Sequence, residues 1–455
     1  MSFSLETTSC HYAYCNKTIT IMKKLITLLT VAAVTVSGYA QTIINGQARQ
    51  SAREEIAANR FLCGSNHLDY DNYPATQKLT PAPKGYEPYL MNHYGRHGSR
   101  WLIGKGEYTN AINTMKKAGD QGKLTAKGKE TLQKLEQFYP TTVNRLGDLT
   151  TVGERQHHGI GRRMAENFPE IFKKKGVSID AKSTVVIRCI LSMEAECEEL
   201  AAANPTARFH NDVSEAFQYY LNAPWPKPLG RSNRKGDEIR HEIRKRYTHP
   251  ERLCSVLFND TQWVRDSIDA AGFMRQLFYI ANNMQSHDTD IELLSLYTSD
   301  ELYDLWRIKN VDWYLSYAHA PQTDGVMAFS QSALLRDIIN VGDTARQTQA
   351  VLRFGHEVCV LPLACLLELG SCGARVENID ALDQVWRNYD IFPMACNVQL
   401  IFYRPKKHKS GDILVKALLN EREMSLPVKA VTGPYVKWSD LRKYYIDKLN
   451  SFKDE

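Results

Sequence analysis

Two arginines and a histidine lie within five residues of one another in the segment "LMNHYGRHGSRW", residues 90–101. Arg96, His97 and Arg100 are cationic or potentially cationic, so they repel one another unless an anion lies among them. Arginine binds phosphate oxygens in pairs, and a neutral imidazole can attack phosphorus once cations have reduced the phosphate charge. The pattern therefore predicts a phosphate site with His97 as nucleophile, with glycine leaving the turn free of a side chain. The alternative is that the arginines form surface ion pairs and that the histidine is incidental.

A second pair of residues with chemical potential is His356 and Glu357, in "FGHEVCVLPL". The histidine can donate a hydrogen bond to a phosphate oxygen. The carboxylic acid can protonate the leaving oxygen if its pKa is high enough to keep it partly protonated. Alone, the pair is a weak signal of a catalytic site. A histidine at a strand end followed by a solvent-exposed glutamate, with no role in catalysis, would give the same two residues.

The surroundings of both segments predict where the fold places them. "EPYLMNHYG" alternates, contains aromatic residues and runs into a glycine, which predicts a strand that delivers Arg96 and His97 to its C-terminal end. "AVLRFGHEVCVLPLACLLELG" predicts a strand, a glycine and then a helix around His356. Active sites of open α/β sheets lie at the C-terminal ends of the strands, so we expect the two segments to meet.

Helices are predicted for most of the chain between the two segments. Apolar residues three or four apart predict helices in 107–119 and 126–140, and a helix from 149 to 172 is expected to begin at a capping Thr150 or Thr151.

A strand is predicted at "VSID" and a helix in "STVVIRCILSMEAECEELAAAN", capped by Ser183 or Thr184. The apolar "VVIRCIL" is also compatible with a buried strand. Near the C-terminus, "VQLIFYRPKKHKSGDILVKALLN" predicts two strands joined by a basic turn.

The order of these elements predicts one α/β domain with a helical domain inserted into it, because a strand-helix alternation is interrupted by a mostly helical stretch. The α/β catalytic domain is expected to comprise residues 41–210 and 341–455, and the helical cap residues 211–340.

Residues 1–40 have the character of an N-terminal extension followed by a secretory signal peptide. Lys23 and Lys24 precede the apolar run "LITLLTVAAVTVSGYA", with cleavage expected after Ala40 and with Met22 as the expected start. The run is shorter than the roughly 20 apolar residues of a membrane-spanning helix. We therefore expect an exported, periplasmic or secreted protein without stable membrane insertion.

The composition is that of a globular protein, with 455 residues of which 43% are hydrophobic and 24% charged. A formal net charge of +6 is too small to indicate nucleic-acid binding by itself. Eight cysteines follow residue 40, and none forms a CxxC pair that would indicate a structural zinc site. Export permits disulfides, but small buried hydrophobic side chains explain the cysteines equally well.

Four ordered motifs together resemble the histidine acid phosphatase family. They are "RHGSR", "LTTVGERQHHGIGRRM", "STVVIRCILSM" and "FGH" followed by an acid. Within the family, the sequence is most similar to the multiple inositol polyphosphate phosphatases, which hydrolyse phytate. The similarity runs from roughly Tyr89 to Tyr403. It implies a phosphoglycerate-mutase-like α/β domain with a helical cap, a phosphohistidine mechanism and no metal or other cofactor.

The resemblance also assigns roles to single residues. His97 matches the nucleophile of the family, and Glu357 stands directly after the second histidine, where most acid phosphatases have an aspartate as proton donor. The phosphate-binding positions of the family are matched by Arg96, Arg100, Arg188 and His356.

The sequence departs from the family pattern in three places. The family usually has an aromatic residue and a proline after its second motif arginine, but here Leu102 follows Trp101. The inositol polyphosphate branch typically reads His-Ala-Glu, whereas the acid here is one position earlier, at Glu357, and Val358 follows. Lys182 stands where the family often has an arginine.

A basic segment in the helical cap predicts how substrates with several phosphates are selected. Residues 227–247, "KPLGRSNRKGDEIRHEIRKRY", contain far more basic than acidic residues and are expected to overhang the site. The possible substrate-binding residues are Arg240, Arg244 and Lys245 in this segment, together with Lys105 and Lys182 near the motifs. The alternative is a solvated helical face with no contact to substrate.

These observations favour an exported phosphomonoesterase that hydrolyses phytate and lower inositol polyphosphates through a phosphohistidine. A broad-specificity histidine acid phosphatase is one alternative. A non-catalytic relative that binds polyanions with the same arginines is another.

Overall fold

The computed structural model describes residues 43–44, 47–72, 78–222, 225–345, 347–407 and 411–452. The predicted signal peptide, the start at Met22 and cleavage after Ala40 all lie outside the described residues. The chain divides into two compact units, Met1–Gln50 and Ser51–Glu455. In the first unit, the described residues form the antiparallel strands β1 (Ile43–Ile44) and β2 (Gln47–Ala48).

The second unit is built around a mixed sheet of nine strands in the described part of the chain. The strand order is β10-β11-β8-β7-β3-β6-β4-β5, with β9 paired to β8. Strands β3, β6, β4 and β5 are parallel, and β7, β8, β9, β10 and β11 pair in antiparallel fashion. The strands are β3 (Tyr86–Arg96), β4 (Ser178–Ser183), β5 (Arg208–Val213), β6 (Ala350–Gly355), β7 (Asn397–Pro405), β8 (Leu414–Leu419), β9 (Arg422–Met424), β10 (Ala430–Thr432) and β11 (Tyr435–Lys437).

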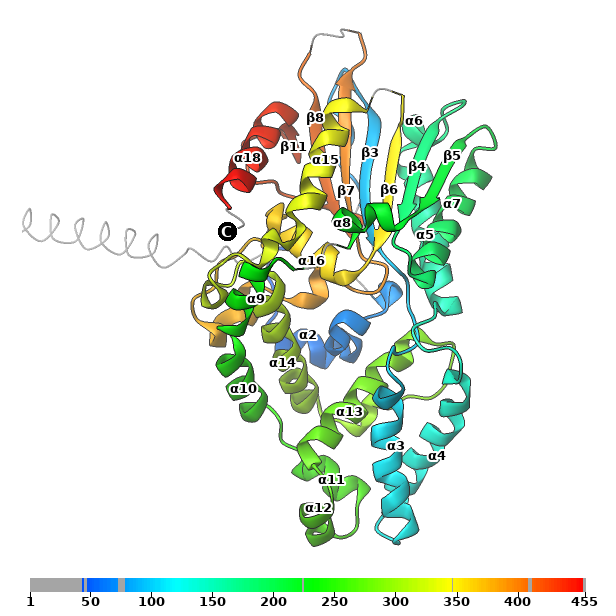
Figure 1. Ribbon diagram of the computed structural model, residues 1–455, viewed down its shortest axis with the longest axis vertical. Helices are drawn as coiled ribbons and strands as arrows, with labels where there is room; N and C mark the ends of the chain where they lie inside the picture. Colours follow the sequence, from blue (N-terminus) through cyan, green and yellow to red (C-terminus); the bar gives the residue numbers. More distant parts are fainter. Residues whose placement is uncertain are drawn as a thin grey trace, which may run out of the picture. The chain divides into compact units, whose positions relative to one another are not determined.

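Helices cover both faces of the sheet and continue beyond the C-terminal ends of its parallel strands (Figure 1). They are α2 (Ala52–Ala58), α3 (Lys105–Asp120), α4 (Ala126–Phe138), α5 (Thr151–Asn167), α6 (Pro169–Phe172), α7 (Ile187–Ala203), α8 (Gln218–Leu221), α9 (Lys227–Arg234), α10 (Asp237–Arg246), α11 (Glu251–Leu257), α12 (Thr261–Ser267), α13 (Ala270–Asn283), α14 (Ser299–Tyr317), α15 (Ser332–Thr344), α16 (Glu357–Leu366), α17 (Leu382–Val385) and α18 (Trp438–Ser451).

Side chains of neighbouring strand residues enter different cores, because successive residues of a strand point to opposite faces. Leu90 belongs to the core shared with α15, α16 and α18, whereas Met91 packs with α5, α6 and α7 on the other face. The central strand β6 is buried along its whole length. This burial explains its apolar sequence, since a parallel strand covered on both sides reads as a continuous hydrophobic run.

The α/β fold class is confirmed, and so are most of the predicted elements. Strands appear at "EPYLMNHYG", "VSID" and "AVLRFG", and β7 and β8 form the predicted C-terminal pair. Residues 51–455 form one compact unit, so the division into a catalytic domain and an inserted cap stays a prediction. No helix in the described residues is long and apolar enough to cross a membrane.

Two predicted helix boundaries need correction. Thr150 caps the long helix as expected, but α5 ends at Asn167, because Pro169 begins the separate helix α6. The predicted caps Ser183 and Thr184 are wrong, since Ser183 ends β4 and the helix α7 begins at Ile187 after Val186, without a side-chain cap. The helix in "IRCILSM" is confirmed.

The cysteine alternatives are resolved for the described residues. Eight cysteines are free and buried: Cys63, Cys189, Cys197, Cys254, Cys359, Cys365, Cys372 and Cys396. They pack as small apolar side chains.

A partly buried ion pair links β6 to α15. Arg353, whose side chain is 1% exposed, donates to Asp337 from Nη2 at 2.6 Å and from Nε at 2.8 Å. Its Nη1 donates to Asn92 Oδ1 at 2.6 Å. Removing one partner of a buried pair leaves an uncompensated charge, which is more costly than loss of the contact itself.

We therefore expect Asp337→Ala to lower the free energy of unfolding by about 3 kcal/mol, measured by urea denaturation. The control is Asp447→Ala, which breaks the exposed pair with Lys443 on α18 and should cost about 0.5 kcal/mol or less. Similar small losses for both variants would show that Arg353 does not depend on Asp337.

Candidate active site

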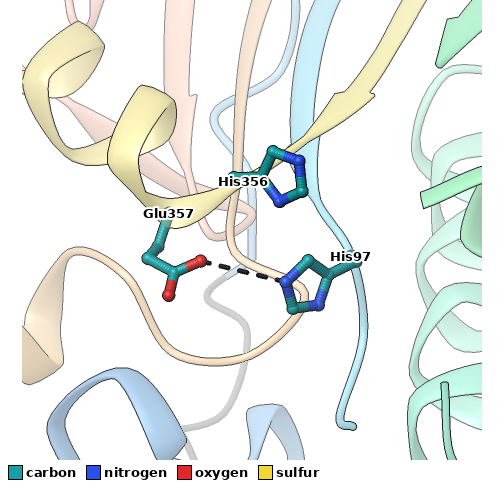
Figure 2. Close-up of side chains that lie close together, drawn as sticks. All are labelled: His97, His356 and Glu357. Carbon is teal, nitrogen blue, oxygen red and sulfur yellow. Dashed lines mark ion pairs between the residues drawn. The ribbon is translucent and has the colours of Figure 1, made fainter. Parts of the chain in front are cut away.

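The site forms where three neighbouring parallel strands end. In the sheet, Arg96 at the end of β3 pairs with Gly355 at the end of β6, and Ser183 at the end of β4 pairs with Phe354. The residues that follow these strand ends therefore converge. Figure 2 shows the result, with the side chains of His97, His356 and Glu357 close together although about 260 residues separate the two segments.

Gly98 is required by a close approach between the "RHG" turn and helix α5. A Cβ atom at Gly98 would lie 2.3 Å from the carbonyl oxygen of Gly153, and one at Gly153 would lie 2.3 Å from that of Ser99. Gln156 Oε1 accepts a hydrogen bond from Ser99 N at 2.9 Å. The sequence prediction attributed this glycine to the turn alone, whereas its main role is to let α5 hold the loop.

His97 is held as a neutral imidazole with one nitrogen free. Its Nδ1 lies 2.8 Å from the carbonyl oxygen of Gly98, which can only accept, so Nδ1 carries the hydrogen. Its buried Nε2 has no hydrogen-bond partner among the described residues. Burial lowers the pKa of His97 well below its usual range, and the charges of Arg96 and Arg188 lower it further. The Nε2 lone pair is therefore available to attack an electrophile.

Three arginines surround this imidazole with hydrogen-bond donors that the described residues do not use. Arg96 is fully buried, and Nη1 donates to backbone carbonyls, including that of Asn66 at 2.8 Å, whereas Nη2 has no hydrogen-bond partner among the described residues. The Nε atoms of Arg100 and Arg188 are also unpaired. Buried donors without partners are costly, so this arrangement favours an anion as ligand.

Glu357 is the one carboxylate among the described residues that pairs with these groups. Its Oε2 lies 3.1 Å from Arg96 Nε and 3.8 Å from His97 Nε2, the contact dashed in Figure 2, and Oε1 accepts from Asn66 Nδ2 at 3.3 Å. Burial raises the pKa of this carboxyl, but the charges of Arg96 and Arg100 outweigh it and hold the pKa at about 2. Glu357 is therefore ionised in this structure and supplies the negative charge that faces Arg96.

His356 caps the start of α16 and faces His97. The centroids of the two rings are 5.6 Å apart, and His356 Nε2 lies 3.4 Å from Thr184 Oγ1. Burial lowers the pKa of His356 to about 4. At neutral pH it is therefore an uncharged group that can donate one hydrogen bond.

A buried pair supports the loop from behind. His157 Nε2 donates to the carbonyl oxygen of Arg96 at 3.1 Å, and Nδ1 lies 3.1 Å from Glu196 Oε2. Both side chains are at most 1% exposed. His157 thus fixes the backbone of the residue before His97.

The predicted peripheral cations lie in different environments. Lys182 pairs with Asp180 at 2.5 Å, and Arg240 is held by Asp312 at 3.0 Å and by Asp237 at 2.9 Å. Both side chains are therefore engaged by neighbouring carboxylates, and their contact with substrate stays a prediction.

The other three predicted cations are exposed, and one of them reaches a cavity. Arg244 lines a cavity between helices, whereas Lys105 and Lys245 are exposed on α3 and α10. Their contact with substrate stays a prediction.

Four further residues lie near the site but belong to no recognisable sequence motif, so the sequence analysis did not predict them. Asn66 contacts Glu357, and His67 is buried with both ring nitrogens unpaired. Tyr279 packs against His67, with ring centroids 4.6 Å apart, and Lys309 lies 5.2 Å from the Tyr279 ring centre. They come from three separate elements, so only the tertiary structure reveals them.

The trio in Figure 2 also contains the atoms of a possible metal site. One ligand atom each of His97, His356 and Glu357 lies within 4.8 Å of the others. The nearby guanidinium groups of Arg96 and Arg100 favour an anion over a cation at this position.

Comparisons with known proteins identify the fold. No protein-family model matches the sequence, and no similar sequence is found among curated proteins. Among solved structures, the multiple inositol polyphosphate phosphatase of Bifidobacterium longum in complex with inositol hexasulfate is similar with a TM-score of 0.64 and 19% identity, covering 84% of this chain and 97% of that chain. The phytase from D. castellii has a TM-score of 0.66 and 14% identity, covering 91% and 90%. Hafnia alvei phytase in complex with myo-inositol hexakis sulphate has a TM-score of 0.52 and 13% identity, covering 80% and 98%. The chain has the fold of these phosphatases.

We expect Gly98→Ala to displace the loop that carries His97, because the new methyl group would overlap the Gly153 carbonyl. Affinity for inorganic phosphate, measured by calorimetry, should fall by about tenfold or more, since a displacement of about 1 Å disrupts convergent hydrogen bonds. Gly106→Ala, in helix α3 with no contact closer than 3.5 Å, is the control and should leave phosphate binding unchanged. Equal affinities for all three proteins would show that the close approach is not needed.

Proposed function

We propose that this protein is a phosphomonoesterase that hydrolyses phytate and lower inositol polyphosphates through a phosphohistidine on His97. The observation that carries the proposal is the neutral imidazole whose free Nε2 lies among three incompletely paired arginines. The inositol sulfates bound to the similar phosphatases support the substrate class. Export to the periplasm or the medium belongs to the same proposal and rests on residues 22–40.

Phosphate binding replaces the ion pair between Arg96 and Glu357. The phosphate oxygens accept hydrogen bonds from the unpaired N–H groups of Arg96, Arg100 and Arg188, and His356 donates a further one. The positive charge withdraws electron density from phosphorus and stabilises the charge of the transition state. It does not repel a protonated nucleophile, because His97 is neutral.

The first chemical step transfers the phosphoryl group to His97. The Nε2 lone pair attacks phosphorus, and the bond between phosphorus and the ester oxygen breaks. The ester oxygen leaves with a proton from Glu357, so the inositol hydroxyl departs as an alcohol. Nδ1 keeps its hydrogen bond to Gly98 and stabilises the phosphorylated ring.

The second step regenerates the enzyme. Water attacks phosphorus, the bond to Nε2 breaks, and the Glu357 carboxylate accepts the proton that water loses. Inorganic phosphate and neutral His97 result. The same carboxyl group thus acts first as an acid and then as a base.

The low pKa of Glu357 sets the conditions for the first step. With a pKa of about 2, the empty site holds a carboxylate, so the proton must enter with the substrate. A phosphate monoester has its second pKa at about 6 and carries that proton below this pH. The bound phosphate also offsets the arginine charges that lower the pKa of Glu357. The proposal therefore includes an acidic pH optimum.

Two alternatives remain distinct from this proposal. A broad-specificity acid phosphatase has the same chemistry but no preference for inositol polyphosphates. A non-catalytic relative binds polyanions with the arginines and releases no phosphate.

The direct test is release of inorganic phosphate from phytate in the presence of a chelator. We expect turnover by the wild-type protein and a loss of at least about a thousandfold in His97→Ala, because the nucleophile is removed. Phytate binding by His97→Ala, measured by calorimetry, should persist because the arginines remain. Absence of turnover in the wild-type protein despite binding would favour the non-catalytic alternative.

The role of Glu357 is tested by substrates whose leaving groups differ in basicity. Glu357→Gln should slow release of an inositol alcohol by about a hundredfold or more, and slow release of nitrophenolate far less, because nitrophenolate leaves without a proton. For the wild-type protein, kcat/KM on an inositol monophosphate should decline by about tenfold per pH unit above about pH 6, as the substrate loses its proton. Equal losses on both substrates would assign the proton to another donor.

A further inference from the structure

A cavity of about 470 Å³ lies among the helices beyond the sheet, between α3, α10, α13 and α14. These four helices lie in the lower part of Figure 1. Its charged lining residues are Glu107, Arg244, Asp269, Arg275, Lys309 and Asp312.

The acidic side chains of this cavity are already engaged. Glu107 Oε2 accepts from the backbone N–H of Gly104 at 2.7 Å, and Asp269 Oδ1 accepts from that of Gly272 at 2.9 Å, so both cap helix starts. Asp312 Oδ1 pairs with Arg240 at 3.0 Å. They are therefore held in place by groups other than the cavity's own cations.

The basic side chains of the cavity form no close ion pair, although its carboxylates act on two of them from a distance. Within the described chain, Arg244, Arg275 and Lys309 form no ion pair within 4.0 Å. Burial disfavours the charged forms of two of them, lowering the pKa of both Arg275 and Lys309. A partly buried cation without a partner is costly for the fold, so its presence beside a cavity indicates an anionic ligand.

The cavity adjoins the active site along helix α13. Arg275, Tyr279 and Asn283 are spaced four residues apart and share one face of this helix. Asn283 Nδ2 donates to the backbone carbonyl of Arg100 at 2.9 Å. At about 1.5 Å rise per residue, Arg275 lies about 12 Å along the helix from the residue that touches the phosphate-binding loop.

Lys309 approaches the active site from α14. Its Nζ lies 5.2 Å from the ring centre of Tyr279, which contacts His67. Burial lowers the pKa of His67, and the charges of Arg100, Arg96 and Lys309 lower it further, so the cations of the cavity and of the active site act on the same buried imidazole. Long side chains on α13 and α14 can thus reach a second anionic group of a ligand held at His97.

We propose that Arg275 and Lys309, with Arg244 at the cavity edge, bind a second phosphate group of the substrate while the first lies at His97. This inference rests on the proposed function and specifies which residues select multiply phosphorylated substrates. It places that selection on α13 and α14, with Arg244 as the contribution of the basic segment 227–247, whereas Arg240 of that segment is engaged in ion pairs.

The test is the double variant Arg275→Gln and Lys309→Gln, assayed on phytate and on p-nitrophenyl phosphate. Each charge-assisted hydrogen bond contributes about 1.5 to 3 kcal/mol, so kcat/KM on phytate should fall by at least about tenfold per residue, mainly through KM. Turnover of p-nitrophenyl phosphate, which has one phosphate, should be unchanged. The control is Lys437→Gln with Lys443→Gln, which removes the same charge from exposed positions on β11 and α18, away from the cavity lining.

Two outcomes would overturn the second phosphate site: equal losses on both substrates, or no loss on phytate. Calorimetry with inositol hexasulfate tests the second phosphate site independently of the proposed function, because it measures binding and requires no hydrolysis. If no variant releases phosphate, the function is wrong, but weaker inositol hexasulfate binding by the double variant still supports the site. Unchanged inositol hexasulfate binding contradicts the site whatever the activity.

Discussion

The constraint on which this structure depends is a fully buried guanidinium, that of Arg96, the residue directly before the nucleophile candidate. Removing such a charge from water costs several kcal/mol, and the fold repays only part of this cost with backbone carbonyls and Glu357. Burial lowers the pKa of His97, and the charge of Arg96 lowers it further; the same charge, with that of Arg100, keeps Glu357 ionised. One side chain therefore contributes to the protonation states of both groups that the proposed chemistry needs.

The surrounding elements position this charge and the imidazole beside it. The strand register places the ends of β3 and β6 side by side, and α16 begins directly at Glu357. Helix α5 supports the loop from the other side through the Gly98–Gly153 contact and the hydrogen bond from His157 to Arg96. Because these contacts are buried, the loop geometry is built into the core.

The sequence predicted the residues at the C-terminal ends of the parallel strands better than the residues that the neighbouring helices bring near them. "RHGSR" and "FGHE" follow strands with clear alternation or continuous burial, so their convergence could be expected from the general rule for α/β sheets. Ser183 was a wrong cap because β4 extends to it, and single-sequence patterns define such boundaries poorly. Asn66, Arg275 and Lys309 carry no local signal, since only helix packing brings them near the site.

The central claim is that the free Nε2 of His97 attacks phosphorus, and trapping the covalent intermediate tests it most directly. The wild-type protein would be mixed with phytate, quenched with base within milliseconds and mapped by peptide mass spectrometry under conditions that preserve phosphohistidine. The account predicts one phosphorylated peptide, containing residues 96–100, with the phosphoryl group on His97 and none in His97→Ala. Rapid phosphate release without any phosphorylated histidine, or with the phosphoryl group on His356, would contradict it.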